Sequence, residues 1–404
     1  MNPVAGLVLS QALCYTATRL AMVAVPWFVL ETTGSPARMG LVLFCEVGAY
    51  ALARLLGGPL LDRWGQRAVS VRADAAASAA VLCVPLAHAA GMLSFPLLLA
   101  LVTVIGLATG PAEAAKVSLA PAAAAAAGVR IERVTGLAGT VDRLSQTVGP
   151  LAAGGAVAAV GALPALYANA VLLALAALVL GAVRVAPPGA HDGSGYLDRL
   201  FTGFRVVWRD PTLRTVVLVL AVTNAIGTAV SSLVLPVWVH GNGMGPEVVG
   251  MVAGSLGAAS VLGSLAATAV GHRLPRRATF LVALALAGPP HIAVLALDVP
   301  LGAVLAVFAV SGLFGGLLNP VLGAVLFERL PPGAVGRGTA TIGALTRLAS
   351  PLGGPVAGAA LAAAGVAPVV LAGAGIYLLA ALAPLFGRAA RGLDRPDPAP
   401  EPSA

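Results

Sequence analysis

The sequence predicts an all-α integral membrane protein whose twelve transmembrane helices form two pseudo-symmetric six-helix bundles. Three observations support this prediction. Of the 404 residues, 59% are hydrophobic and only 10% are charged, with a mean hydropathy of +0.95, whereas soluble proteins average roughly 25% charged residues. The apolar residues form runs of about 20 or more, the length that a helix needs to cross a bilayer. The two halves of the chain also match each other in sequence.

Breaks rich in glycine, proline and charge separate the apolar runs and set their limits. Arginine occupies the breaks after the even-numbered runs, and the opposite breaks hold no basic residue. Lys and Arg stay on the cytoplasmic side, so we expect a multi-pass protein of a bacterial plasma (inner) membrane with both termini cytoplasmic. The predicted spans are 5–31, 37–62, 68–89, 94–118, 134–160, 164–184, 212–239, 246–271, 278–297, 300–326, 338–364 and 367–388.

An internal repeat relates the two halves. A shift of 210 positions places Pro26 on Pro236 and Gly40 on Gly250, and a shift of 204 places Arg143 on Arg347 and Gly154 on Gly358. The longest polar break lies between the matching parts. The predicted domains are an N-terminal bundle (1–186), a cytoplasmic linker (187–211), a C-terminal bundle (212–390) and a disordered tail (391–404).

The loop after the second span, GPLLDRWGQR, concentrates charge in a chain that has little. It resembles the signature loop of the major facilitator superfamily, and GHRLPRR at 271–277 resembles its weaker second copy. ETTGSPARMGLVL, GFRVVWRDPTLR and RLASPLGGPVAG resemble the macrolide-efflux-like branch of drug:proton antiporters. The motif residues are Gly58, Asp62, Arg63, Gly65, Arg67, Arg72 and Asp74.

The resemblance implies that this loop latches the cytoplasmic face shut. Asp62 can face a helix N-terminus, which favours a carboxylate, while Arg63 and Arg67 can pair with acidic groups or anionic headgroups. A plain positive-inside anchor is the alternative. Gln66 stands where the family has arginine, which either weakens the charge network or leaves Arg72 to supply the charge, with Asp74 as its partner.

A glycine-proline stretch in the fifth span, GLAGTVDRLSQTVGPLAAGG, resembles the signature of proton-driven exporters. Small residues allow tight helix contact and proline bends the helix, so generic helix packing explains the pattern nearly as well. The marker positions are Gly136, Ser145, Gly149, Pro150, Gly154 and Gly155, with Ser145 in place of one glycine of the signature.

Ionisable residues inside predicted spans are the candidates for proton coupling or transport, because each costs at least ~2.5–3.5 kcal/mol there without a partner or wet cavity. Glu46 is the leading proton carrier, since burial disfavours its charged form; a permanent Arg19–Glu46 ion pair is the alternative. Glu113 and Lys116 are expected to pair locally. The remaining candidates are Asp142, Arg143 and Arg347 for substrate binding or structure, and Asn169, Asn224 and Asn319 for the cavity lining.

The sequence does not support the other functional classes that we considered. The basic residues form no soluble patch, which argues against nucleic-acid binding. The chain has neither a phosphate-binding loop nor a catalytic motif, and its three cysteines lack metal or disulfide spacing. We expect no enzyme, metal or cofactor, with the proton gradient as the energy source.

The resemblance implies a functional monomer that exports amphipathic small molecules by alternating access, through a cavity lined by the first, fourth, seventh and tenth spans. The alternatives are uptake or export of one specific metabolite by the same fold, and a non-transporting membrane sensor derived from a carrier.

Overall fold

The computed structural model describes residues 2–184, 204–205, 207–270, 275–329 and 335–383. The side chains of Asp62 and Asn319 lie outside this description, as do most of the predicted linker (187–203) and the whole predicted tail (391–404). The predicted domain boundaries therefore stay a prediction.

Every predicted span coincides with a helix or with a run of consecutive helices, and the described residues contain no strand. The elements are α1 (Pro3–Thr33), α2 (Pro36–Leu56), α3 (Gly58–Trp64), α4 (Gln66–Ala89), α5 (Phe95–Ser118), α6 (Ala120–Ala127), α7 (Ile131–Val160), α8 (Ala162–Gly181), α10 (Pro211–Ala229), η1 (Val230–Val234), α11 (Leu235–Gly241), α12 (Pro246–Val270), α13 (Arg276–Ala287), α14 (Pro289–Ala293), η3 (Val294–Ala296), α15 (Leu301–Arg329), α16 (Val335–Leu348), α17 (Ser350–Ala364) and α18 (Val366–Leu382).

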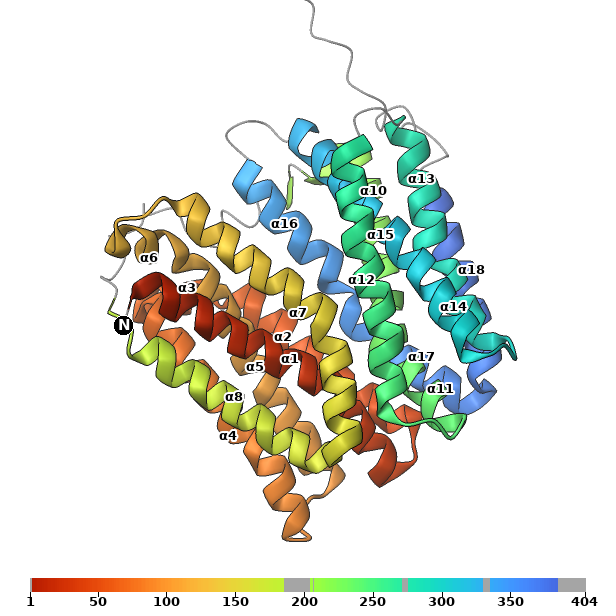
Figure 1. Ribbon diagram of the computed structural model, residues 1–404, viewed down its shortest axis with the longest axis horizontal. Helices are drawn as coiled ribbons and strands as arrows, with labels where there is room; N and C mark the ends of the chain where they lie inside the picture. Colours follow the sequence, from red (N-terminus) through yellow and green to blue (C-terminus); the bar gives the residue numbers. More distant parts are fainter. Residues whose placement is uncertain (1, 185–203, 206, 271–274, 330–334, 384–404) are drawn as a thin grey trace, which may run out of the picture. The chain divides into compact units, whose positions relative to one another are not determined.

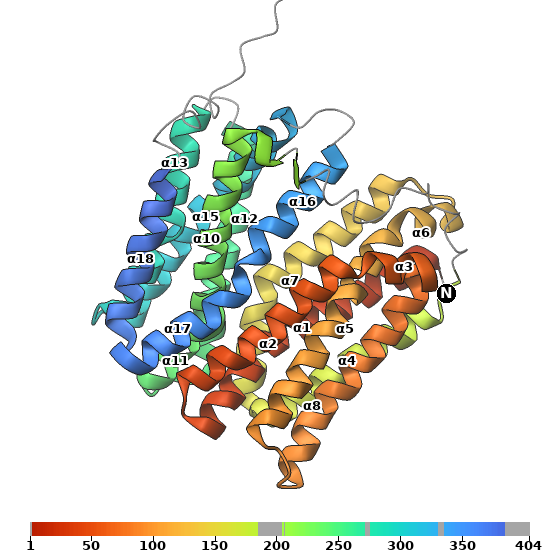
Figure 2. The same ribbon diagram turned by 180° about the vertical axis from the view of Figure 1, so that it is seen from behind.

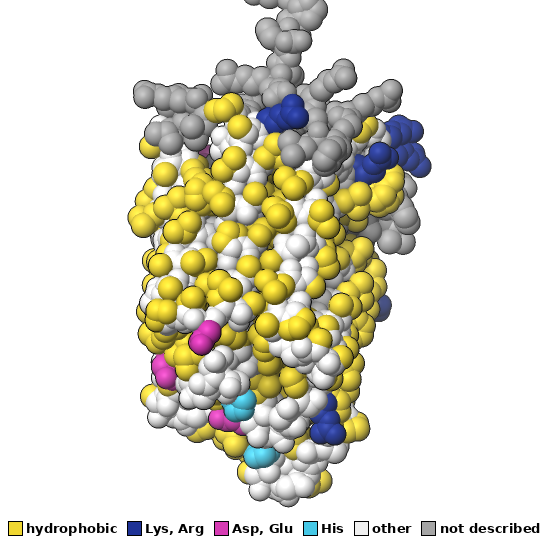
Figure 3. Space-filling model, turned by 90° about the vertical axis from the view of Figure 1, so that its right-hand side faces the viewer, with side chains coloured by type: hydrophobic (Ala, Val, Ile, Leu, Met, Phe, Trp, Pro, Cys, Tyr) yellow, Lys and Arg dark blue, Asp and Glu magenta, His cyan; other side chains and the backbone are white. Residues whose placement is uncertain are grey.

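Length and composition alone identify 9 candidate membrane spans among the described residues. The other predicted spans fall outside this criterion of length and composition, each for its own physical reason. Helix α7 carries four charged residues, the next-to-last span is divided into α16 and α17, and α18 has only 17 residues. The face in Figure 3 is mainly hydrophobic and uncharged in its middle, as a lipid-facing surface requires.

The described chain forms two compact units. The first comprises the described residues of 1–196, 228–254 and 350–366. Within it, α1 lies against α7 and α8, α4 contacts both α5 and α8, and α2 packs against α5 and α17 (Figures 1 and 2). Its core is built largely from alanines such as Ala17, Ala77 and Ala108, which let the helix backbones approach closely.

The second unit comprises the described residues of 197–227, 255–349 and 367–404. Helices α13 and α15 pack along each other within it. The ring of Tyr377 on α18 covers Gly288, where any side chain would collide with it. Glycine at this position therefore lets the Tyr377 ring of α18 pack directly against the backbone between α13 and α14.

Each unit contains a crossing in which two glycines, one turn apart on one helix, face the backbone of another helix, and the repeat relates these two crossings. In the first unit, a Cβ on Gly106 or Gly110 of α5 would collide with the α2 backbone around Tyr50. In the second unit, a Cβ on Gly312 or Gly316 of α15 would collide with the α12 backbone. The shift of 210 carries α2 onto α12, and a shift of 206 carries both glycines of α5 onto those of α15. The structure thus agrees with a duplicated, pseudo-symmetric fold.

Candidate functional site

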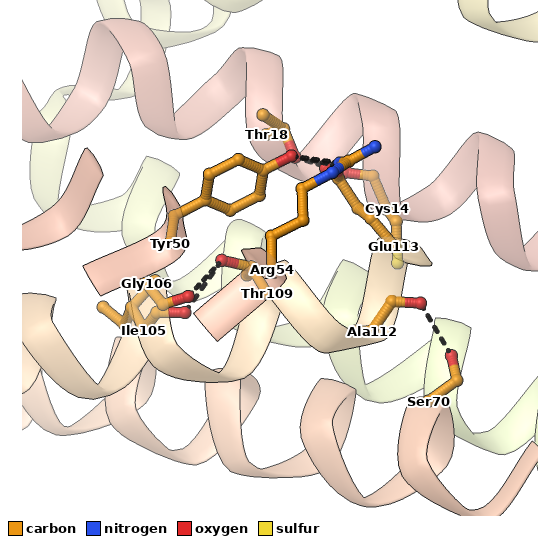
Figure 4. Close-up of polar contacts among 10 residues, drawn as sticks. All are labelled: Cys14, Thr18, Tyr50, Arg54, Ser70, Ile105, Gly106, Thr109, Ala112 and Glu113. Atoms are coloured by element: carbon orange, nitrogen blue, oxygen red, sulfur yellow. Dashed lines mark hydrogen bonds and ion pairs between the residues drawn. The ribbon is translucent and has the colours of Figure 1, made fainter. Parts of the chain in front are cut away.

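A partly exposed polar cluster joins α2 to α5 (Figure 4). Tyr50 and Arg54 lie one helical turn apart on α2, so both side chains point towards Glu113 of α5. The Tyr50 hydroxyl donates to Glu113 Oε2 at 2.6 Å, and Arg54 Nη1 donates to the same oxygen at 2.9 Å and also to the Tyr50 hydroxyl. The Arg54 and Glu113 side chains are 45% and 22% exposed. We call these three residues the α2–α5 cluster.

The glycine crossing brings these side chains together. Gly110 lies one turn before Glu113 in α5, and a Cβ there would lie 2.7 Å from the Tyr50 carbonyl oxygen and 3.0 Å from the Arg54 nitrogen. Because glycine removes this clash, the two backbones come close enough for short side chains to bridge them. Thr109 uses its hydroxyl within α5, donating to the Ile105 oxygen at 2.9 Å (Figure 4), and does not join the cluster.

A second polar cluster lies one turn further along α5 and is buried. Lys116 Nζ binds Asp74 Oδ2 of α4 at 2.6 Å and Oδ1 at 2.8 Å, and reaches Cys14 Sγ of α1 at 3.0 Å. The Cys14 thiol donates to Asp74 Oδ1 at 3.5 Å. All three side chains are buried. We call these residues the buried cluster.

Two predicted pairings are wrong. Glu113 pairs with Arg54 rather than with Lys116, and Lys116 instead pairs with Asp74 of α4 in the buried interior. Asp74 therefore does not pair with Arg72. The exposed Arg72 guanidinium lies 5.5 Å above the ring of Trp64 instead.

The two clusters differ in what they can do chemically. A buried charge without its partner is costly, so Asp74 and Lys116 stabilise the packing of three helices by staying together. The α2–α5 cluster is partly open, and its carboxylate can exchange Arg54 for another cation or for a proton at lower cost.

The leading candidate from the sequence, Glu46, lies one turn before Tyr50 on α2 and is half-buried. Its backbone carbonyl is part of the contact with Gly106. Arg19 Nη1 donates to Met22 Sδ at 3.3 Å. The predicted Arg19–Glu46 pair stays a prediction, and Glu46 shares a helix and a face with the α2–α5 cluster.

The other candidates occupy separate places. Asp142 of α7 accepts from Gln146 Nε2 at 2.8 Å, while Arg143 and, on α16, Arg347 are exposed.

Two predicted cavity residues make structural bonds. Buried Asn169 donates from Nδ2 to the Ala17 oxygen at 2.9 Å, which joins α8 to α1. Asn224 of α10 donates to the Thr346 oxygen of α16 at 3.1 Å. Asn319 is placed on α15, with its side chain outside the description.

The signature loop forms the short helix α3 and a turn at Gly65. Gly65 has φ 76°, a conformation that only glycine adopts readily. Arg67 donates to the carbonyl oxygens of Leu180, at 3.3 Å, and Gly181. These carbonyls end α8, where the helix dipole favours a cation. Arg67 thus stabilises α8, Arg63 is exposed, and the latch role of the loop stays a prediction.

The glycine-proline motif divides into packing and open positions. A Cβ on Gly149 would touch the Arg19 side chain, and one on Gly154 would lie 2.8 Å from Gly250 Cα of α12. A Cβ on Gly40 of α2 would lie 3.3 Å from Gly358 Cα of α17. In the repeat, Gly40 corresponds to Gly250 and Gly358 to Gly154, so the two contacts are equivalent. Nothing lies within 4 Å of a Cβ at the motif's other two glycines, Gly136 and Gly155.

A family model described as Major Facilitator Superfamily matches residues 7–241 and 217–404. The chain belongs to the major facilitator superfamily. It is therefore a multi-pass membrane transporter with a small-molecule substrate, and not an enzyme.

Curated relatives and solved structures agree with this family. The multidrug efflux pump Tap of Mycobacterium tuberculosis is 29% identical over 360 residues, covering 87% of this chain and 85% of that protein. Tap of Mycolicibacterium fortuitum is also 29% identical, covering 87% and 88%. The crystal structure of nucleoside transporter NupG shares the fold with a TM-score of 0.75 at 14% identity, covering 95% of this chain and 98% of that chain. A bacterial homologue of the lysosomal transporter Spinster gives 0.74 at 15% identity, covering 98% of each chain.

Tyr50 and Arg54 are not among the candidates expected from the sequence, and Glu113 pairs with Arg54 instead of the expected Lys116. The sequence did contain a signal for them. Glu46, Tyr50 and Arg54 follow one another at one-turn intervals on the second span, and Glu113 lies at a similar depth on the fourth span. Gly106 and Gly110 of α5 form a GxxxG pattern, which indicates close packing against another helix without identifying α2 as that helix.

Proposed function

We propose that this superfamily transporter exports amphipathic small molecules, such as antibiotics or secondary metabolites, across a bacterial plasma membrane in exchange for protons. Both termini face the cytoplasm, and one chain is the functional unit. The observation that carries the proposal is the partly exposed α2–α5 cluster, whose Glu113 lies on the fourth span. The multidrug efflux pumps at 29% identity support export as the direction.

In the proposed cycle, the Glu113 carboxylate takes up a proton from the outer side and loses its ion pair with Arg54. The released Arg54 keeps its bond to the Tyr50 hydroxyl, which holds the guanidinium within reach of Glu113. Loss of the proton to the cytoplasm restores the pair. Glu46 lies one turn before Tyr50 on α2 and is the second proton carrier of this cycle. The alternating exposure of a half-buried carboxylate is a means of coupling proton movement to transport.

A drug-susceptibility panel in a pump-deficient bacterial host tests the proposal. Expression of the chain is expected to raise the inhibitory concentration of several amphipathic compounds, and Glu113→Gln is expected to remove this protection. Glu132→Gln is the matched control, because Glu132 is 71% exposed and only loosely paired, at 3.6 Å, with Arg130. Protection by Glu113→Gln equal to that of the wild type, at equal expression, would contradict the role of Glu113. Protection against no compound would contradict export of this substrate class.

A further inference from the structure

A short helical segment directly before α10 carries an exposed aromatic pair. Phe204 and Trp208 lie one turn apart and stack, with ring centroids 5.0 Å apart and planes at 16°. The two side chains are 39% and 41% exposed. Large aromatic side chains that are exposed at the start of a span indicate contact with a lipid or protein surface rather than with water alone.

Two arginines accompany this pair. Arg205 and Arg209 are exposed and also one turn apart, and together with the aromatic residues they line one hollow. The segment therefore combines two apolar rings and two guanidinium groups in a single surface, which we call the Arg205–Arg209 surface.

The opposite side of the segment fixes it in place. Val207 is fully buried against Leu213 and Val217 of α10 and Ile342 of α16. Asp210 then caps α10, its Oδ1 accepting from the Thr212 nitrogen at 2.7 Å and the Leu213 nitrogen at 3.1 Å. The Arg205–Arg209 surface is thus held at the point where the chain starts its seventh span.

This position and composition fit a membrane interface. Tryptophan concentrates at the headgroup level of bilayers, and arginine lies on the cytoplasmic side. Guanidinium groups bind phosphate oxygens through paired hydrogen bonds, and basic pockets beside spans attract anionic headgroups. We propose that the Arg205–Arg209 surface binds an anionic phospholipid, with the headgroup phosphate at Arg205 and Arg209 and the acyl chains beside Phe204 and Trp208.

The test measures lipid retention on the purified full-length protein by native mass spectrometry, using phosphatidylglycerol and phosphatidylcholine as probes. The wild type is expected to retain phosphatidylglycerol in preference to phosphatidylcholine. The double variant Arg205→Gln/Arg209→Gln is expected to lower the affinity for phosphatidylglycerol about 30-fold, from two charges near the surface. Arg130→Gln/Arg133→Gln, which removes two exposed arginines from another loop, is expected to leave retention unchanged.

Two further arms separate the possible sources of the phosphate. Phe204→Ala/Trp208→Ala is expected to weaken binding of long-chain phosphatidylglycerol and to spare its short-chain analogue. Excess inorganic phosphate is expected to displace no lipid. Equal loss of lipid from both arginine variants, or displacement by inorganic phosphate at millimolar concentration, would overturn the proposal.

Discussion

The α2–α5 crossing and the α12–α15 crossing have the same backbone architecture and different chemistry. Both use two glycines one turn apart to bring two helices into contact, at Gly106 and Gly110 in one unit and at Gly312 and Gly316 in the other. The first crossing carries ionisable groups where the second does not. The shift of 210 relates Glu46 to Leu256, Tyr50 to Ser260 and Arg54 to Ser264. The shift of 206 relates Glu113 to Asn319.

This difference distinguishes the glycines that both crossings share from the ionisable residues that only the first crossing carries. After duplication, a residue needed only for packing is expected in both copies, and a residue needed for transport in one copy is free to differ. In the second crossing the Ser264 hydroxyl donates to the Gly316 carbonyl oxygen at 3.1 Å, which closes the contact without charge. The glycines therefore fit a packing role in both copies, and the α2–α5 cluster is the part for which we propose a role in transport.

The largest expected effect concerns the buried cluster. Lys116→Met leaves the Asp74 carboxylate buried and unpaired, so we expect the free energy of unfolding to fall by about 3–5 kcal/mol. Adding Asp74→Leu is expected to recover most of this loss. Arg130→Met is the control, since its pair with Glu132 is exposed and contributes about 0–1 kcal/mol. A loss under about 1 kcal/mol for Lys116→Met would show that the buried cluster does not stabilise the fold.

The next effect tests whether the crossings are equivalent. Gly106→Ala and Gly312→Ala each place a methyl group against a facing helix backbone, so each is expected to cost about 1–3 kcal/mol of stability by overpacking. Gly155→Ala is the control, because nothing lies within 4 Å of its Cβ position. Reversible unfolding in mixed micelles measures all three. A cost confined to one of the two crossings would refute their shared role.

A smaller effect on stability and a clear effect on transport are expected for Tyr50→Phe. The substitution removes the hydrogen bond to Glu113, at a cost of about 1 kcal/mol. Arg54 then loses its second acceptor, so the pH dependence of drug export is expected to shift while the maximal rate at the new optimum is kept. Tyr167→Phe, on an exposed tyrosine of α8, is the matched control. An unchanged pH profile would remove Tyr50 from the coupling site.

Helix positions and the repeat could be predicted from the sequence because spanning a bilayer imposes length, composition and charge rules on each segment. The pairing partners of individual charged residues could not be predicted, because they depend on which helix faces are in contact. Lys116 is within one turn of Glu113 in sequence and yet pairs with Asp74, 42 residues away. The glycines at Gly106 and Gly110 set the distance between α2 and α5, which brings Arg54 within reach of Glu113. Their effect becomes visible only once the two helices are known to touch.

We propose that a proton gradient drives export through the Glu113 carboxylate at the α2–α5 crossing. The most direct measurement is drug flux in proteoliposomes with an imposed pH gradient, for the wild type and for Glu113→Gln. The gradient is expected to accelerate flux by the wild type and by Glu132→Gln, whereas Glu113→Gln is expected to transport at the gradient-free rate. A full gradient response in Glu113→Gln, or none in the wild type, would contradict this proposal.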